Sequence, residues 1–316
     1  MPESLSLPDR QQQHSTGRSF LRPRRAWRAG NIALTSGLLL FGVVIAGALA
    51  APLIAALTGH GPTEQFRATG LDEMGLPVGP GKEFLLGTDG LGRDVLVRIL
   101  YGARVSLLVG IPATTLALVI GTLLGLLAGW FRDWRGKLLD RIMDVVLAFP
   151  FVLMALALIT LNRDAAGRPV LAPEVLVILV IALFSWIYFA RLVRSIVQTL
   201  RHGPLVEAAQ VSGADTATIL LRDILPILAP KLAVFWAVQL PVNIVAEATL
   251  SFLGVGIAAP MPSLGNMIAD AQRSGLYQIQ PWLLLGPGLM LFLAVAGANL
   301  IAAGTRTWLD PNSARS

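Results

Sequence analysis

The chain has 316 residues, of which 54% are hydrophobic and only 14% are charged, and its mean hydropathy is +0.67. Because soluble domains are about a quarter charged, this composition indicates an integral membrane protein and excludes a large soluble domain. The net charge of +6 does not indicate a nucleic-acid partner, since basic cytoplasmic loops produce the same excess in membrane proteins. The chain has no cysteine, which excludes a disulfide framework.

Residues 1–30 are polar and end in a cluster of arginines between Arg18 and Arg28. We expect a cytoplasmic tail whose last turn meets anionic lipid headgroups. Residues 31–57 form the first long apolar segment. Ala48-Leu49-Ala50 resembles a signal-peptidase site, but the apolar run is longer than the 7–15 residues typical of a signal peptide. We therefore predict an uncleaved spanning helix.

A polar segment rich in glycine and proline follows, at 59–82, and we predict that it is a loop. The next segment, 84–108, predicts a helix capped by Thr88 or Asp89 that leads into a membrane span. The helical spacing separates an apolar side from a polar side. The apolar side carries Val95, Leu96, Ile99 and Leu100, and the polar side carries Arg93, Asp94 and Arg98.

Five further apolar segments meet the criterion of about 20 residues for a spanning helix. They lie at 105–130, 142–161, 173–193, 232–250 and 282–303, and a polar tail follows at 304–316. The sequence thus predicts an all-α, polytopic membrane protein with six transmembrane helices in one transmembrane domain, 31–303.

A polar stretch at 201–230 interrupts the apolar segments. Gly203-Pro204 ends the preceding helix, and Pro204 suits the first position of a new one. Glu207 falls in the first turn of that helix, where the macrodipole favours a carboxylate. Gly213 ends the helix, because glycine adopts the left-handed conformation at little cost.

A second short helix is predicted after this glycine. Asp215 can cap it, and it runs to Ile224, with Pro226 and Pro230 marking its end. The stretch is therefore expected to form two short helices outside the bilayer.

The residues of this stretch resemble a known motif. Glu207-Ala208-Ala209, then Gly213, then Ile224-Leu225-Pro226 resembles the EAA loop of permease subunits in binding-protein-dependent ABC importers. In that family the loop docks into a groove on a cytoplasmic ATPase. The resemblance implies an ATPase-coupling role for seven residues: Glu207, Ala208, Ala209, Gly213, Asp215, Leu225 and Pro226. One departure is Asp223, where relatives often carry a basic residue or histidine.

Two further motifs narrow the resemblance. LGTDxxGRDVLxRxxYGAR at 86–104 and SFLGxGxxxPxPSxGNM at 251–267 resemble the dipeptide, oligopeptide and nickel branch of these permeases. The resemblance implies the second permease subunit of such an importer, with a type I transmembrane domain. Its implied partners are a homologous permease, two ATPases, an external solute-binding protein and membrane lipid. ATP and magnesium would be bound by the ATPases, so this chain is expected to bind no cofactor and to have no enzymatic activity.

Basic residues give the orientation. With both termini in the cytoplasm, seventeen lysines and arginines fall in inside segments and eight in outside segments. This excess has the sign that the positive-inside rule requires, and it places 201–230 on the cytoplasmic side. We therefore expect a multi-pass protein of the bacterial inner membrane.

Several kinds of chemistry are absent from the sequence. It contains no P-loop, no H-E-x-x-H and no G-x-S-x-G. The three histidines, His14, His60 and His202, match no ligand spacing, so no metal site is predicted. An intramembrane hydrolase would lack both a nucleophile and a base.

Polar residues inside the spans are few. Glu247 is the most interior carboxylate, and we consider it, Ser251 and Asn243 as candidates for the pathway or the outer gate. Because Glu247 lies near the outer end of its span, the alternatives are that it reaches water or headgroups, or that it bonds to loop backbone. Asp140, Asp144, Asn243 and Asn299 are expected to form interhelical hydrogen bonds.

The resemblance implies alternating access driven by ATP. The alternative function is a secondary transporter or channel driven by an ion gradient, but the paired midplane carboxylates and repeated halves common in those folds are not found. The identity of the solute is not encoded in this sequence.

Overall fold

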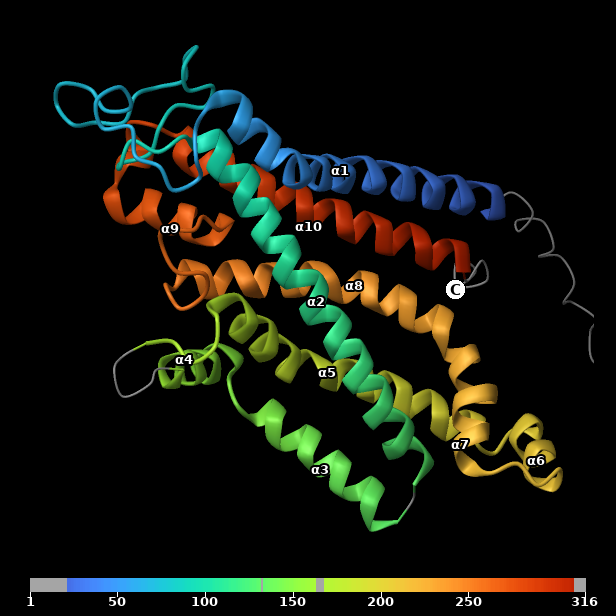
Figure 1. Cartoon of the computed structure of the whole chain (residues 1–316). Helices are drawn as coiled ribbons and strands as arrows, with labels where there is room; N and C mark the ends of the chain where they lie inside the picture. The colour runs from blue at the N-terminus through green and yellow to red at the C-terminus, as the bar shows by residue number, and fades with distance from the viewer. Residues whose placement is uncertain (1–21, 132, 163–167, 310–316) are drawn as a thin grey trace, which may run out of the picture.

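The computed structural model describes residues 22–131, 133–162 and 168–309 (Figure 1). The regular elements within these residues are helices, and two isolated β-bridges, Leu71 with Pro77 and Thr88 with Asp94, lie in the loop before the second helix. The α-helices are α1 (Arg22–Thr58), α2 (Val95–Trp130), α3 (Trp134–Ala148), α4 (Phe151–Leu161), α5 (Pro173–Leu200), α6 (Pro204–Val211), α7 (Thr216–Thr218), α8 (Leu225–Phe252), α9 (Leu264–Ser274) and α10 (Trp282–Leu309). A π-helical turn, Ile219–Ile224, joins α7 to α8, and a 3₁₀ turn, Leu276–Gln278, follows α9.

Five helical segments of the described chain are long and apolar enough to cross a membrane. A sixth crossing is obtained if α3 and α4, which meet at an angle of 87°, are counted as one broken span. These helices confirm the predicted fold class of an all-α polytopic membrane protein.

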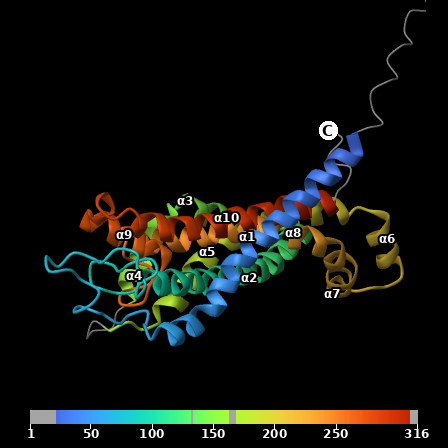
Figure 2. The ribbon, with the colours of Figure 1, turned by 90° about the horizontal axis from the view of Figure 1, so that it is seen from above.

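The long helices run between two distinct ends of the molecule (Figures 1 and 2). One end carries the loop 59–94 and α9. The other end carries α6, α7, the start of α1 and the end of α10. We call them the loop end and the α6 end.

A stripe of glycines holds α2 against α5. A Cβ atom on Gly121 would lie 2.4 Å from the carbonyl oxygen of Trp186, and one on Gly125 would lie 2.7 Å from that of Ala190. Real Cβ atoms do not approach so closely, so any larger residue would push the helices apart. In the sequence, Gly121, Gly125 and Gly129 recur every four residues, a spacing that predicts close helix packing, and these contacts confirm it.

The start of α2 differs from the prediction. The helix runs without interruption from Val95, ten residues before the expected span, and Asp94 caps it by accepting a hydrogen bond from the Val97 amide at 3.1 Å. The predicted caps, Thr88 and Asp89, lie in the preceding loop. Arg98, expected on an exposed polar side, is only 2% exposed because that loop folds over the first turns of α2.

The predicted third span, 142–161, is wrong as one straight helix. The chain is already helical from Trp134, and it breaks between Ala148 and Phe151. Pro150 causes the break, because a proline disfavours helical geometry in the residue before it. Phe149 is accordingly extended, with φ −84° and ψ 129°.

The predicted end of the second short helix in 201–230 is also wrong. The chain is helical from Thr216 to Phe252, through both Pro226 and Pro230. Pro226 falls at the start of the α8 hydrogen-bond ladder, directly after the π-helical turn, where its missing amide costs little. The span predicted at 232–250 is therefore only part of a longer helical segment, which begins at Thr216.

The predicted tails are shorter than expected. Residues 22–30 belong to α1 and 304–309 belong to α10, whereas the remainder of both tails lies outside the described residues. Helix α9 was not predicted. Its signal was Ser263 three residues before Asn266, which form a reciprocal capping box.

Candidate functional site

The candidate site is the α6 segment, whose start follows the local rules of the sequence. Gly203 is the extended N-cap residue and Pro204 occupies the first helical turn. Glu207 lies in that turn with an exposed side chain, and Ala208 beside it is also exposed. The small alanines leave this face of α6 open, with no long side chain to cover its backbone.

Gly213 ends α6 in a Schellman motif. Its φ is +81°, and the Gly213 amide donates to the Gln210 carbonyl at 3.0 Å. The Ala214 amide donates to the Ala209 carbonyl, also at 3.0 Å. This pair of bonds satisfies two free carbonyls at the helix end and requires the left-handed conformation at position 213. A Cβ atom there would meet no neighbour within 4 Å, so a substitution is penalised by backbone strain alone.

One buried side chain anchors α6 to the rest of the protein. Val206 is fully buried and belongs to the same apolar core as Ile219, Leu220 and Ile224 of the π-helical turn. On the other side of α6, Leu205 is 50% exposed and Val211 is 90% exposed. The helix therefore has an anchored face toward the π-helical turn and an apolar face without a partner in the described chain.

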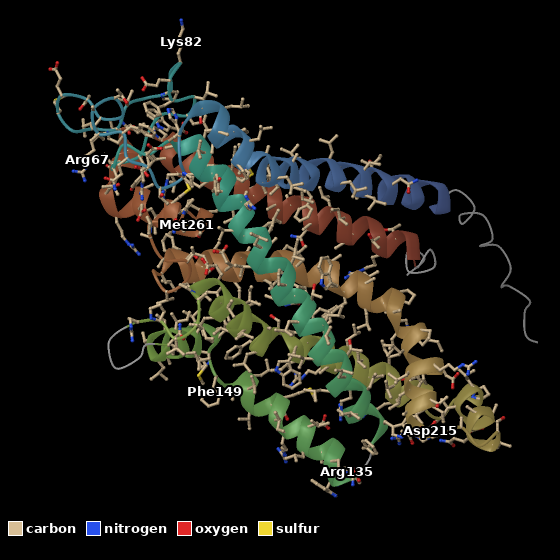
Figure 3. The ribbon with its side chains drawn as sticks, viewed as in Figure 1. Arg67, Lys82, Arg135, Phe149, Asp215 and Met261 are labelled. Carbon is tan, nitrogen blue, oxygen red and sulfur yellow. The ribbon has the colours of Figure 1, made fainter. Side chains whose placement is uncertain are left out.

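Asp215 begins the helix that leads back into the bundle. It is the N-cap residue of α7 and lies at the α6 end, away from Arg67 and Lys82 at the loop end (Figure 3). Its carboxylate makes no capping hydrogen bond of good geometry to α7, yet hydrogen bonding from the Thr218 side chain lowers its pKa below the ordinary value. Leu225 is half-buried and Pro226 is exposed at the junction with α8.

The seven EAA-loop residues thus lie in one segment at the α6 end. The π-helical turn in this segment was not predicted. Such turns occur mostly as single insertions within helices, frequently at functional sites. Because α7, this turn and α8 are continuous, the turn that packs against α6 leads directly into a membrane-spanning helix.

Asn243 lies at the centre of a buried hydrogen-bond network. The Ser185 hydroxyl of α5 donates to Asn243 Oδ1 at 2.8 Å, and Asn243 Nδ2 donates to Thr114 Oγ1 of α2 at 2.9 Å. Asn243 is 1% exposed. It joins three helices, as expected for an amide inside a bundle. Ser185 and Thr114 were missed, because a single hydroxyl in an apolar segment is a weak signal.

Glu247 is fully buried and does not reach water or headgroups, nor does it bond loop backbone directly. Its Oε2 atom accepts a hydrogen bond from Ser106 of α2 at 2.7 Å, and its Oε1 atom accepts one from Ser251 at 2.8 Å. The Ser251 hydroxyl in turn accepts from the Ile257 amide at 3.1 Å. Glu247 therefore links α8 to α2 and, through Ser251, to the loop before α9.

A cluster of charged side chains lies at the loop end, with Arg93 and Arg98 buried and Asp89 17% exposed. Asp89 Oδ2 lies 2.7 Å from Nε of Arg93 and 3.2 Å from Nε of Arg98. Arg98 also donates to the carbonyls of Pro62 and Pro260, at 2.8 and 3.4 Å. The cluster fastens the loop 59–94 and the loop between α8 and α9 to the first turn of α2. The sequence contained these residues in its 86–104 motif, but it did not show that they are buried.

Ion pairs between α3 and α5 occur toward the α6 end. Arg191 lies 2.8 Å from Asp144, and Arg194 lies 2.5 Å from Asp140. The expected interhelical bonding of these two aspartates is confirmed. Asn299, in contrast, is exposed on α10, and its side chain has no hydrogen bond within the described chain.

Comparison with known proteins identifies a family. Residues 121–315 match the family of binding-protein-dependent transport system inner membrane components. The chain is 40% identical over 236 residues to a glutathione transport system permease of Pectobacterium atrosepticum, covering 75% of each chain. It is 40% identical over 233 residues to a dipeptide transport system permease of Alkalihalophilus pseudofirmus, covering 74% of this chain and 73% of the relative.

A relative that matches over more of the chain agrees with these. The di/tripeptide transport system permease of Pseudomonas aeruginosa is 36% identical over 284 residues, covering 90% of this chain and 89% of the relative. Permease subunits of this family are non-catalytic and bind no cofactor themselves; an ATPase and a solute-binding protein complete the importer. The chain belongs to the binding-protein-dependent transport system inner membrane components, as a multi-pass inner-membrane permease subunit of an ABC importer.

Proposed function

We propose that α6 and its flanking residues dock on the cytoplasmic ATPase and transmit its movement to α8. The observation that carries this proposal is the two-sided construction of α6. Its exposed face presents Leu205 and Val211 at a polar end of the molecule, and its buried face is anchored by Val206. An exposed apolar surface of this kind is typical of a contact with a partner protein.

The proposal includes the orientation. The α6 end, with the start of α1 and the end of α10, faces the cytoplasm, and the loop end faces outward. The distribution of basic residues supports this orientation, because seventeen of them fall in segments assigned to the inside. Cysteines introduced singly at Thr216 and Lys82 test it, since the chain has no cysteine of its own. Labelling of the Thr216 position by an impermeant reagent in intact cells would overturn the orientation.

The importer is proposed to contain this chain, a homologous second permease, two ATPases and one external binding protein. Closure of the ATPase dimer on ATP moves α6, and the rigid connection through the π-helical turn tilts α8 so that the pathway opens outward. The solute shifts this equilibrium only through a difference in affinity between the two states.

The solute is proposed to be a small peptide. The names of three relatives support this, since they are described as transporting glutathione, dipeptides and di- or tripeptides. Glu247, Ser251 and Asn243 are proposed to brace the pathway helices without contacting the solute, because their polar groups bond to other groups of this chain.

Gly213→Val tests the coupling role. A β-branched residue in this left-handed conformation costs roughly 1–2 kcal/mol of backbone strain. Its side chain meets no neighbour, so the helix bundle should not be disturbed. Assembly with the second permease should be retained, while uptake is lost or separated from hydrolysis. Uptake of a labelled dipeptide and ATP hydrolysis are measured on the same vesicles, reconstituted with all partners.

Gly213→Asn is the matched control, because asparagine tolerates the left-handed conformation better than other residues. It should retain most of the coupling. Wild-type uptake and wild-type hydrolysis in Gly213→Val would show that this loop is not the coupling element.

A further inference from the structure

A cleft opens between α5, α8 and α10 at the α6 end. It has a volume of about 560 Å³, and most of its wall is apolar, formed by Leu192 of α5 and by Ile227, Val234 and Phe235 of α8. Two cations complete the lining, Lys231 of α8 and Arg306 of α10. Among the residues that the structure describes, no acidic residue lines the cleft.

Neither cation is neutralised within the described chain. The side chains of Lys231 and Arg306 are exposed, and they make no ion pair or hydrogen bond with any residue that the structure describes. On the neighbouring α5–α3 contact the arrangement is different, since Arg191 and Arg194 each pair with an aspartate. As far as the described residues go, the cleft therefore carries two positive charges and no counter-charge.

Each cation alone is accounted for by its place on its helix. Arg306 lies in the last turn of α10, where a cation offsets the helix dipole, and a lysine near the end of a span extends toward the interface. Neither effect requires the two cations, from different helices, to line the same apolar cleft. That convergence is what a bound anion would require.

The position of the cleft along the spanning helices indicates which kind of anion it would bind. Arg306 is near the end of α10, and Lys231 is only seven residues beyond Ile224, so both lie where the apolar spans meet the polar α6 end. A free anion would gain nothing from the walls formed by Leu192, Val234 and Phe235. An amphiphile with a negative headgroup fits both parts, and basic pockets between transmembrane helices bind such headgroups.

We propose that this cleft binds one anionic phospholipid. Its phosphate lies between Lys231 and Arg306, and one acyl chain follows the apolar wall between α5 and α8. The bound lipid would rest against α8, the helix that continues from the π-helical turn, and would tie it to α10. The inference does not depend on the ATPase docking proposed for α6.

The full-length chain, purified in mild detergent, is titrated with phosphatidylglycerol and phosphatidylcholine of the same acyl chains, and bound lipid is counted by native mass spectrometry. We expect one tightly bound phosphatidylglycerol and no comparable phosphatidylcholine. The double variant Lys231→Gln/Arg306→Gln should bind phosphatidylglycerol roughly twenty-five-fold more weakly, a factor of five for each cation.

Lys137→Gln/Arg141→Gln is the matched control, because both cations are exposed on α3 and lie outside the cleft. It should bind phosphatidylglycerol like the wild type. Equal binding of the two lipids, or equal losses in the two double variants, would overturn the proposal.

Two further measurements separate lipid binding from capture of a free anion and from a loss of folding. Millimolar inorganic phosphate should not displace the lipid; displacement would mean that the cleft takes a free anion and would overturn the proposal. The thermal unfolding midpoint of the double variant without added lipid should equal that of the wild type, since both side chains are exposed. If the midpoint of the double variant falls, the single variant Lys231→Gln replaces it in the binding test. We expect this single variant to bind phosphatidylglycerol about fivefold more weakly than the wild type.

Discussion

At the loop end charged side chains are largely buried and paired, whereas at the α6 end most motif residues are exposed and Val206 is the one fully buried side chain of α6. Asp89, Arg93 and Arg98 tie two loops to α2 with little access to water. Glu207 and Gly213 lie on the surface, and Val206 alone of α6 is buried. The charge cluster at the loop end resists deformation, because moving one of its side chains would leave the other charges away from water without a partner. The exposure of α6 leaves this short helix accessible for binding by a partner protein.

Removing the carboxylate at the centre of the loop end should have the largest effect. Asp89→Ala leaves Arg98 buried without its carboxylate and Arg93 with only the exposed Asp270 at 3.9 Å, and we expect a loss of about 3–5 kcal/mol in the free energy of unfolding. The measurement is thermal or denaturant unfolding of the purified chain. Glu73→Ala, at an exposed position of the same loop, is the control and should change little. An unchanged midpoint for Asp89→Ala would mean that the buried cluster does not stabilise this end.

Glu247 should have the next largest effect. Glu247→Ala leaves the hydroxyls of Ser106 and Ser251 without their acceptor, at a cost of about 1–3 kcal/mol. Glu247→Gln retains an acceptor and should be milder. If Glu247 braces helices without touching the solute, the glutamine variant keeps the wild-type KM for uptake. A large rise in KM without loss of stability would place this side chain in the pathway.

The anchor of α6 gives a smaller, local effect. Val206→Ala removes two buried carbons, so we expect α6 to loosen by roughly 1.5 kcal/mol. Hydrogen exchange of the α6 amides should accelerate while the spanning helices keep their protection. Val211→Ala makes the same change at a position that is 90% exposed, so it should leave exchange of the isolated chain unaltered. Equal exchange in the two variants would contradict the anchoring role.

Asp215 should have the smallest effect on stability. Its pKa is lowered in the folded chain, so any stabilisation it provides is fully present above its ordinary pKa and is lost only as the pH falls through the lowered value. Asp215→Asn should therefore leave the dependence of stability on pH unchanged between about pH 6 and 8. Unfolding midpoints of the two proteins across that range provide the measurement, and a divergence of their slopes would refute the assignment.

The sequence alone determined the features that depend on local chemistry. Long apolar segments must be helical in a bilayer, because the backbone has no other partners there. Pro204 and Gly213 marked the two ends of α6, since each residue restricts or permits one backbone conformation. The spacing of Gly121 and Gly125 predicted close helix packing, because residues four apart lie on the same face of a helix.

Only the tertiary structure decided where polar side chains go and how far helices continue. Arg98 reads as the polar side of a surface helix until a loop distant in sequence covers it. Glu247 reads as a group near water until Ser106, on another helix, bonds it. Pro226 reads as a helix end, but a π-helical turn places it where its missing amide is harmless. In each case the deciding partner lies on another segment or arises from a change of hydrogen-bond register, neither of which a local pattern of residues contains.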